Sequence, residues 1–389
     1  MPFQRPAYQR KEVFSALGQS KNWGIDMFQV PELWKYSKGK GVKIAILDTG
    51  ATDPAHVDLQ GAYVACRNFT SDKPDSFIDR DSHGTAVAGV IGARDNDFGV
   101  IGIAPECSLY SAKVLRDDGT GDERFVIDAI DWAIEMGVDI INMSFGTRKQ
   151  PTRALQEAIR KAYINNITLF AASGNVGENG NIDTIDWPAK YPEVISVGAI
   201  NRDQLRSTFS SVGQRIDLLA PGEDIITTSL NNDYATFSGT SFACPFAVGV
   251  AALCIASHRV FPSKTPCETP TQVREHLLKT AIDVGAPGWD KEGGFGIIHP
   301  VSVLDMESLT KSEVVGDFRV SNRVVPELQY IKARKKVDPI RVAQLTMNFT
   351  VETFDGEQKG LPGDFLAVDG KGAVFIITKE EFEKYYETV

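Results

Sequence analysis

Ser241 lies in the segment GTSFACPFAVGVAAL, in which a hydroxyl stands just before a long apolar stretch. A serine hydroxyl is a weak nucleophile at neutral pH, so an enzyme that uses one also needs a general base, a carboxylate that orients the base and a donor that stabilises an oxyanion. The chain has a candidate for each role: Asp48 follows the apolar run VKIAIL, His83 stands in DSHGTAVAG, and Asn175 stands in LFAASGN. Together these residues predict acyl-transfer chemistry at Ser241.

Each motif alone has a simpler interpretation, because Ser241 also suits a helix N-cap and Asp48 a strand-ending turn. The order Asp, His, Ser is nevertheless the order of subtilisin. With all of these motifs present, the sequence over 19–306 resembles the subtilisin-like serine peptidases. The resemblance implies that Ser241 is the nucleophile, His83 the general base, Asp48 the group that orients it and Asn175 the oxyanion donor.

The resemblance also implies that a peptide substrate is held as an added strand between two extended segments. They correspond here to Gly119-Thr120-Gly121 and Ser144-Phe145-Gly146. Main-chain pairing of this kind gives affinity with little demand on sequence, and side-chain pockets then set the preference. Asp186 aligns with the floor of the family's primary specificity pocket, where a carboxylate favours Lys or Arg before the scissile bond. The alternatives are a solvated loop acid or an acid held by a cation.

Calcium is the cofactor that the resemblance implies. The loop over 94–100 matches the family's tight calcium loop, although a sequence of this kind is often only a polar turn. Oxygen-only ligation with several carbonyls suits calcium better than magnesium. The implied ligands are side-chain oxygens of Gln19, Asp58 and Asn96 and backbone oxygens of Arg94, Phe98 and Val100.

The N-terminal segment distinguishes this chain from secreted relatives. Gln19 aligns with the second residue of a typical mature subtilisin, and we expect the segment over 1–18 to be too short for a folding-chaperone prodomain. This resembles the intracellular subtilisins, which carry a short inhibitory extension with a proline–aromatic blocking motif. Arg5-Pro6-Ala7-Tyr8 is similar to that motif, and its proline would hinder self-cleavage. The alternative is a frayed tail.

Short apolar runs alternate with helical patterns along the chain. The runs over 42–47, 138–145, 167–173, 194–200 and 216–221 predict buried strands, and helices are predicted over 125–136 and 152–164. Nearly continuous apolar character is typical of parallel strands that are covered on both faces. We therefore predict an α/β fold, a doubly wound and mostly parallel sheet flanked by helices, with the site beyond the carboxyl ends of the strands.

The resemblance ends near residue 308, and the remaining sequence has a different pattern. The runs over 345–351 and 373–377 predict further strands. We predict an N-terminal extension over 1–18 with an inhibitory role, a subtilisin-like catalytic domain over 19–308, and a small β-rich C-terminal module over 309–389 of unknown role.

The composition is typical of a soluble globular protein. With 51 acidic against 41 basic residues, the net charge of −10 argues against nucleic acid as the main partner. We find no apolar run near membrane-spanning length and no signal-peptide core at the N-terminus. The five cysteines lack the spacing of a metal site or a disulfide framework, which suggests reduced thiols in a cytoplasmic protein. The expected partners are polypeptide substrates, with no membrane and no nucleic acid; self-association stays undetermined.

The sequence thus predicts a serine endopeptidase that acts through an acyl-enzyme intermediate. Two alternatives stay open, an acyl transferase that ligates or cyclises peptides and an inactive peptide-binding scaffold. No inserted lid that would exclude water is visible, which disfavours the transferase. The intact set of Asp48, His83, Ser241 and Asn175 disfavours the scaffold.

Overall fold

The computed structural model of the chain divides into two units, Met1–Asp305 and Met306–Val389. In the first unit it describes residues 2–11, 18–51, 56–70, 76–177, 183–260 and 267–300. In the second unit it describes residues 318–321, 331–335, 339–344, 349–353, 356–368, 374–379, 382 and 386–388. The domain boundary predicted at 308/309 lies outside the described residues.

A parallel sheet of seven strands organises the first unit, in the order β12-β11-β10-β9-β4-β7-β5. The strands are β4 (Lys43–Asp48), β5 (Tyr63–Asn68), β7 (Ser108–Lys113), β9 (Ile140–Met143), β10 (Thr168–Ala172), β11 (Val194–Ile200) and β12 (Leu218–Pro221). This confirms the predicted α/β fold. Strands β5 and β7 were not predicted, because polar residues interrupt their apolar character.

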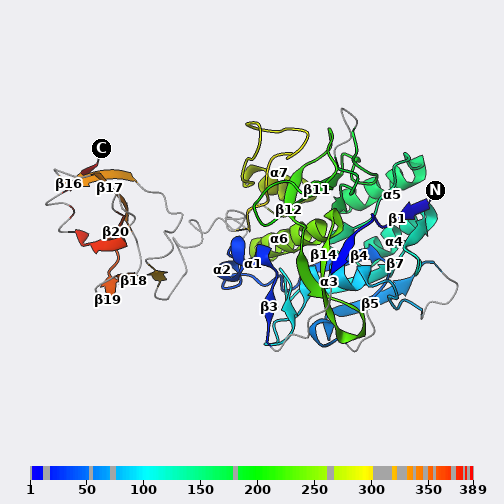
Figure 1. The fold of residues 1–389 in the computed structure, drawn as a ribbon, viewed down its shortest axis with the longest axis horizontal. Coiled ribbons are helices and arrows are strands. Elements are labelled where there is room, and N and C mark those ends of the chain that lie inside the picture. Colours follow the sequence, from blue (N-terminus) through cyan, green and yellow to red (C-terminus); the bar gives the residue numbers. More distant parts are fainter. Residues whose placement is uncertain are drawn as a thin grey trace. The chain divides into compact units, whose positions relative to one another are not determined.

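Helices cover both faces of this sheet (Figure 1). The main helices are α3 (His83–Gly92), α4 (Glu123–Glu135), α5 (Arg153–Ile164), α6 (Thr240–Val260) and α7 (Pro270–Lys279), with short α1 (Trp23–Met27) and α2 (Val30–Leu33) before them. Ala45 and Leu47 of β4 belong to a core cluster with α4 and α5. Because side chains alternate along a strand, the buried Ile44 and Ile46 point to the opposite face, where α3 packs against α6.

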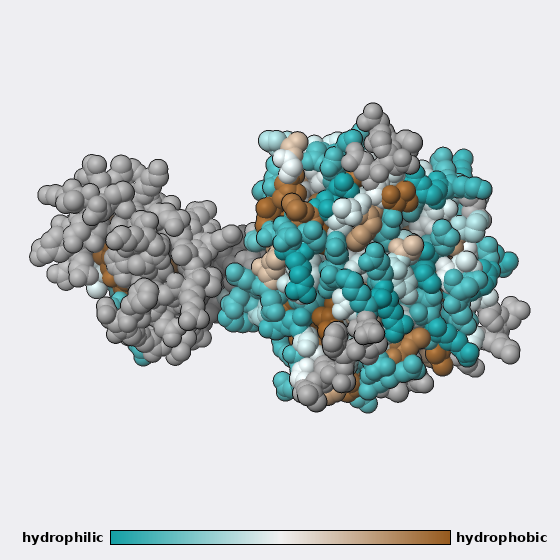
Figure 2. Space-filling model, viewed as in Figure 1, coloured by the Kyte–Doolittle hydropathy of each residue, from teal (hydrophilic) through white to brown (hydrophobic). Residues whose placement is uncertain are grey.

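Helix α6 carries Ser241 in its first turn and is long and apolar enough to cross a membrane, by length and composition alone. The prediction that no apolar run approaches such a length is therefore wrong. The apolar residues of α6 from Phe242 to Ala256 are buried inside the first unit, so its hydrophobicity is that of a core helix. Figure 2 shows hydrophilic residues over most of the visible face of this unit, with separate apolar patches between them.

The N-terminal residues form strands that pair with strands of the first unit. Strand β1 (Pro2–Gln4) pairs antiparallel with β8 (Thr120–Asp122). Strand β2 (Gln9–Lys11) pairs with β14 (Tyr234–Ser238), which in turn pairs with β13 (Ile225–Thr228). Strands β3 (Ser20–Lys21) and β6 (Val100–Ile101) form a separate parallel pair. Paired strands thus stand before and after Arg5-Pro6-Ala7-Tyr8, β1 on the N-terminal side and β2 on the C-terminal side. This pairing contradicts the frayed-tail alternative.

The second unit is β-rich, as predicted. One sheet has the order β15-β18-β19 and the other the order β21-β20-β17-β16-β22. Their strands are β15 (Phe318–Ser321), β16 (Ile331–Lys335), β17 (Pro339–Gln344), β18 (Phe349–Thr353), β19 (Gly356–Gly360), β20 (Phe365–Val368), β21 (Val374–Ile377) and β22 (Tyr386–Thr388). Residues 345–348 of one predicted strand lie outside the described residues, and the rest of it falls in β18.

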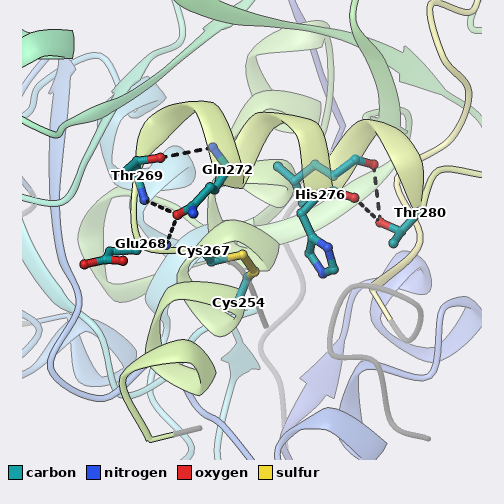
Figure 3. Close-up of a disulfide and its surroundings, with 8 residues drawn as sticks. Cys254, Cys267, Glu268, Thr269, Gln272, His276 and Thr280 are labelled. Carbon is teal, nitrogen blue, oxygen red and sulfur yellow. Dashed lines mark hydrogen bonds between the residues drawn. A yellow bond between two sulfur atoms is a disulfide. The ribbon is translucent and has the colours of Figure 1, made fainter. Parts of the chain in front are cut away.

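The prediction of five reduced thiols is wrong, because Cys254 of α6 and Cys267 form a disulfide (Figure 3). Their Cα atoms lie 6.3 Å apart, within the range that a disulfide spans. The contact arises because the C-terminal part of α6 lies beside the start of α7, which the spacing of the cysteines does not indicate. The imidazole of His276 on α7 lies close to the two sulfur atoms. Cys66, Cys107 and Cys244 are free.

Candidate active site

The carboxyl end of β4 and the start of α3 bring Asp48 and His83 together. The Nδ1 atom of His83 lies 2.8 Å from Oδ1 of Asp48, and both side chains are fully buried. Because an ionised carboxylate only accepts hydrogen bonds, Nδ1 carries the proton and Nε2 presents a lone pair. Within the described part of the chain, Nε2 has no hydrogen-bond partner. This is the arrangement that a general base requires.

Ser241 lies in the first turn of α6 and is tied to the residue that follows β9. Its Oγ donates to the carbonyl oxygen of Ser144 at 3.0 Å, and Oγ of Ser144 donates to the carbonyl oxygen of Ser241 at 2.9 Å. The Ser241 hydroxyl therefore points toward Ser144 in this structure, while the Asp48–His83 pair is already formed.

Asn175 follows β10 and faces the start of α6. Its Oδ1 accepts hydrogen bonds from the backbone N–H of Thr240 at 2.9 Å and from the Thr240 hydroxyl at 2.8 Å. These contacts turn Nδ2 the other way, where it donates to the carbonyl oxygen of Ala7 at 2.8 Å. Asn175 thus has the orientation of an oxyanion donor. The Thr240 hydroxyl helps to fix this orientation of Asn175.

Both segments that were predicted to hold a substrate hold residues of the chain's own N-terminus. Phe3 and Gln4 of β1 pair with Gly121 and Thr120 of β8. On the other side, Gln4 and Gly146 exchange two backbone hydrogen bonds, of 3.1 and 3.0 Å. Phe3 is fully buried and packs edge-on against Phe145, with ring centroids 5.4 Å apart. The N-terminal strand is therefore sandwiched as the sequence predicts for a substrate.

Beyond this strand, the chain continues over the catalytic residues. The ring of Tyr8 lies 5.3 Å from the His83 ring and 5.8 Å from that of Phe242, centroid to centroid. Phe242 follows Ser241 in α6, and its ring lies 5.5 Å from that of His83. The three rings thus form one cluster, in which Tyr8 of the N-terminal segment contacts both the imidazole and Phe242.

The register of the Gln4–Gly146 pair, extended by two residues along each strand, puts Pro6 opposite Ser144. Gln4 and Gly146 form a hydrogen-bonded antiparallel pair, so the residues two positions further on each strand form the next such pair. An ordinary residue at this position would donate its N–H to the Ser144 carbonyl, but proline has no N–H. The carbonyl instead accepts the Ser241 hydroxyl.

Asp186 lies beside this strand and is only 7% exposed, so the solvated-acid alternative is wrong. A Cβ atom on Gly146 would come within 2.7 Å of the Asp186 Cβ, which shows how closely the acid approaches the paired strand. Nη1 of Arg148 lies 3.5 Å from Asp186 Oδ1. Burial raises the pKa of Asp186 to about 6, although Arg148 and Lys190 oppose this shift.

Most of the predicted calcium ligands lie in contact with one another. Nε2 of Gln19 donates to the carbonyl of Arg94 at 3.0 Å, and Nδ2 of Asn96 donates to Asp58 Oδ1 at 3.1 Å. The backbone N–H of Val100 donates to Asp58 Oδ2 at 2.7 Å. The N–H of Phe98 joins the same loop by donating to Asn96 Oδ1 at 3.1 Å.

The Asp58 carboxylate is fully buried, and no basic side chain of the described residues is paired with it. An ionised carboxylate in such surroundings requires compensation, which a cation would supply. The set of carboxylate, amide and carbonyl oxygens therefore fits calcium.

One acid near the site was not predicted. Asp81, two residues before His83, pairs with Arg5 of the N-terminal segment at 2.8 Å. Its position in the motif DSHG was the only available signal, because its partner lies 76 residues away in the sequence.

Comparison with known proteins places this geometry in context. A family profile described as the subtilase family matches residues 39–296. The intracellular serine protease of Paenibacillus polymyxa is 40% identical over 296 residues, which cover 75% of this chain and 89% of that relative. Subtilisin E of Bacillus subtilis (strain 168) is 40% identical over 268 residues, or 69% of this chain and 68% of the relative. The minor extracellular protease Epr of the same organism is 39% identical over 280 residues, 72% of this chain but only 41% of Epr.

Proposed function

The chain belongs to the subtilase family, and for this subtilisin-like serine endopeptidase we propose a reaction through an acyl-enzyme on Ser241. The observation that carries the proposal is the 2.8 Å contact of His83 Nδ1 with Asp48, which leaves the Nε2 lone pair without a partner in the described residues. Asn175 and Ser241 supply the donor and the nucleophile on the neighbouring elements.

The reaction follows from these positions. A substrate N–H donates a hydrogen bond to the Ser144 carbonyl in place of the Ser241 hydroxyl, which then turns toward His83. Oγ then attacks the substrate carbonyl carbon as Nε2 accepts its proton, and Nδ2 of Asn175 with the Ser241 backbone N–H stabilises the oxyanion. The C–N bond breaks, and His83 returns the proton to the leaving amine. Water then attacks the acyl-enzyme, with His83 again as the base, and the product carboxylic acid is released. Mass analysis of the products distinguishes this hydrolysis from acyl transfer to an amine, and Ser241→Ala tests the nucleophile.

The N-terminal segment acts as an inhibitor in this proposal. The Asn175 amide donates to the Ala7 carbonyl, while the register set by Gln4 and Gly146 puts Pro6 opposite Ser144 and next to the nucleophile. In a cleavable substrate, the same residue donates its N–H to the Ser144 carbonyl and offers its own carbonyl oxygen to the Asn175 amide. Pro6 has no N–H and therefore cannot make the first of these contacts. The segment therefore lies between the two substrate-binding segments and over His83 without placing a peptide bond where Ser241 could attack it. Its removal activates the enzyme.

The carboxylate of Asp186 provides a preference for Lys or Arg before the scissile bond. Its burial beside Gly146 supports this role, because an ionised acid in partly dry surroundings attracts a cation more strongly than in water. The neighbouring Arg148 neutralises part of that charge, so the preference is moderate rather than absolute. Cleavage of matched Arg and Phe substrates tests it.

Calcium in the loop over 94–100 stabilises the fold rather than taking part in the reaction. The buried Asp58 carboxylate and the amide and carbonyl oxygens around it would hold the ion. Metal analysis of the purified protein tests this part of the proposal.

A cytoplasmic location is supported by the similarity to a protease named intracellular. The Cys254–Cys267 disulfide argues in the other direction, since such bonds are rare in the cytosol. Alkylation of free thiols at the moment of cell lysis, followed by peptide mass analysis, tests the location. A cytoplasmic protein with reduced Cys254 and Cys267 supports the proposal, and an oxidised pair in the secreted fraction contradicts it.

A further inference from the structure

Arg5 and Asp81 form a contact that the proposed mechanism does not use. Both Nε and Nη2 of Arg5 lie close to Oδ2 of Asp81, at 3.0 and 2.8 Å. With Arg5 in place, only 6% of the Asp81 side chain is exposed. A charge-assisted contact with two donors on one carboxylate oxygen is among the stronger hydrogen bonds in proteins.

The position of Arg5 in the paired strand makes this contact relevant to substrates. The backbone N–H of Arg5 donates to the Gly119 carbonyl at 3.1 Å. The next residue, Pro6, stands opposite Ser144 and thus beside the nucleophile. A substrate residue in the place of Arg5 is therefore P2, the residue that precedes P1, where P1 is the residue before the scissile bond.

The surroundings of Asp81 leave room for a long basic side chain. Gly119 has a φ of +78°, and a Cβ atom there would come within 2.6 Å of the Arg5 Nε. A glycine is thus required where the Arg5 side chain passes. The other close neighbour is the ring of Tyr8, whose centroid lies 4.8 Å from the Arg5 guanidinium carbon. Tyr8 belongs to the N-terminal segment and would leave with it.

The loop that carries Asp81 is fixed by a buried acid. Oδ1 of Asp79 accepts from the backbone N–H of Asp81 at 2.9 Å and from that of Ser82 at 3.0 Å. Its Oδ2 accepts from the N–H and hydroxyl of Thr85, at 2.8 and 2.7 Å. Because Asp79 ties this loop to helix α3, the backbone position of Asp81 is held by contacts that do not involve Arg5.

Within the described residues, Arg5 is the only basic group in ion-pair contact with Asp81. Removal of the N-terminal segment therefore leaves a carboxylate without a cation, facing the strand that a substrate would form. We propose that Asp81 is a second cation subsite, which binds the Lys or Arg side chain of the P2 residue, so that the enzyme prefers paired basic residues before the cleaved bond. This inference rests on the proposed endopeptidase function, and Arg5 is then an internal copy of the substrate side chain.

The test uses the full-length chain and peptides that differ only at P2, with Arg or its neutral isostere citrulline there and Arg at P1 throughout. The N-terminal segment competes equally with both peptides, so the ratio of their kcat/KM values is independent of inhibition. We expect Arg to be favoured about tenfold over citrulline, as a partly exposed charge-assisted contact allows. Asp81→Asn, which keeps the shape of the side chain, should bring the ratio close to one.

A structural role of Asp81, or an effect on His83, would slow both peptides together and leave the ratio unchanged in Asp81→Asn. A wild-type ratio within twofold of one overturns the inference without any variant, even if Asp81→Asn does not fold. An unchanged ratio in a folded Asp81→Asn also overturns it. If neither peptide is cleaved by wild type or by a chain without the N-terminal segment, the endopeptidase proposal itself fails. Cleavage of both peptides with no P2 preference removes only the Asp81 subsite.

Discussion

The side-chain amide of Asn175 donates a 2.8 Å hydrogen bond to the carbonyl oxygen of Ala7, a residue 168 positions earlier in the chain. The group that would stabilise an oxyanion is thus occupied by a carbonyl of the chain itself. Tyr8, the next residue, covers the imidazole of His83. These contacts connect the predicted inhibitory segment to the predicted catalytic residues.

Removal of the N-terminal segment should raise activity. A chain that begins at Gly18 no longer carries a tethered competitor, and tethering corresponds to effective concentrations of about a millimolar or more. We expect kcat/KM toward a peptide substrate to rise at least about tenfold, measured against the full-length chain. Pro6→Ala is the matched variant, because it restores the N–H opposite Ser144 and should speed self-cleavage after residue 6. Equal activity of the full-length and shortened chains would show that the segment does not inhibit.

Loss of the Asn175 amide donor should lower turnover. Asn175→Ala removes one oxyanion donor, for which a loss of roughly 10²–10³ in kcat is expected. Because Asn175 Oδ1 also accepts hydrogen bonds from Thr240, the variant needs a control for local structure. Asn175→Asp keeps the acceptor and removes the donor, so it should be similarly slow. A kcat near the wild-type value in both folded variants would exclude Asn175 from oxyanion binding.

Chelation should destabilise the protein. A ligand present at about 100 times its Kd adds about 2.7 kcal/mol to the free energy of unfolding, which corresponds to a Tm change of roughly 4–5 °C for a domain of about 290 residues. We expect the Tm to decrease by this amount when calcium is removed. Scanning calorimetry measures the decrease, on the Ser241→Ala chain so that autolysis is avoided. Asp58→Asn should have a low Tm that chelator no longer changes. If chelator leaves the Tm of the chain with intact Asp58 unchanged, no ion occupies the loop.

The preference for Arg at P1 should depend on pH. Burial raises the pKa of Asp186 from 3.8 to about 6, despite Arg148 and Lys190. The carboxyl is therefore neutral below this pH and ionised above it, so the Arg-over-Phe ratio of kcat/KM should increase as pH rises through about 6. Effects of pH that are common to both substrates cancel in the ratio.

Asp186→Asn should give a low ratio that is independent of pH, at least about tenfold below wild type at pH 8. The same pKa shift has a consequence for stability. The folded state binds more protons than the unfolded state between the two pKa values, so ionisation of Asp186 lowers the free energy of unfolding as pH rises from about 4 to 6. A wild-type ratio that is flat with pH would indicate that Asp186 does not contact the P1 side chain.

Much of the fold could be predicted because its signals are local. Strand β4 is a continuous apolar run, and Asp48 follows directly from the rule that sites form at the carboxyl ends of parallel strands. Strand β5 could not be predicted, because its burial is partial and Arg67 and Asn68 interrupt its pattern. The Cys254–Cys267 disulfide depends on how α6 and α7 pack, which no spacing rule contains.

The candidate site divides in the same way. His83 and Ser241 lie in recognisable local motifs, whereas the partner of Asp81 is set only by the path of the N-terminal strand through the site. The register that puts Pro6 opposite Ser144 is likewise a property of paired strands. The short motif Arg5-Pro6-Ala7-Tyr8 indicated a blocking role, but only the pairing of Gln4 with Gly146 gives that role a mechanism.

Covalent labelling with a fluorophosphonate, followed by peptide mass analysis, shows whether Ser241 is the activated nucleophile. The reagent requires a serine activated by a base and an oxyanion site. We expect one adduct on Ser241 in the chain that begins at Gly18, slower labelling of the full-length chain, and loss of both labelling and peptide hydrolysis in Ser241→Ala. Hydrolysis that persists in a folded Ser241→Ala protein, or an adduct on a different residue, would contradict the assignment of Ser241 as the nucleophile.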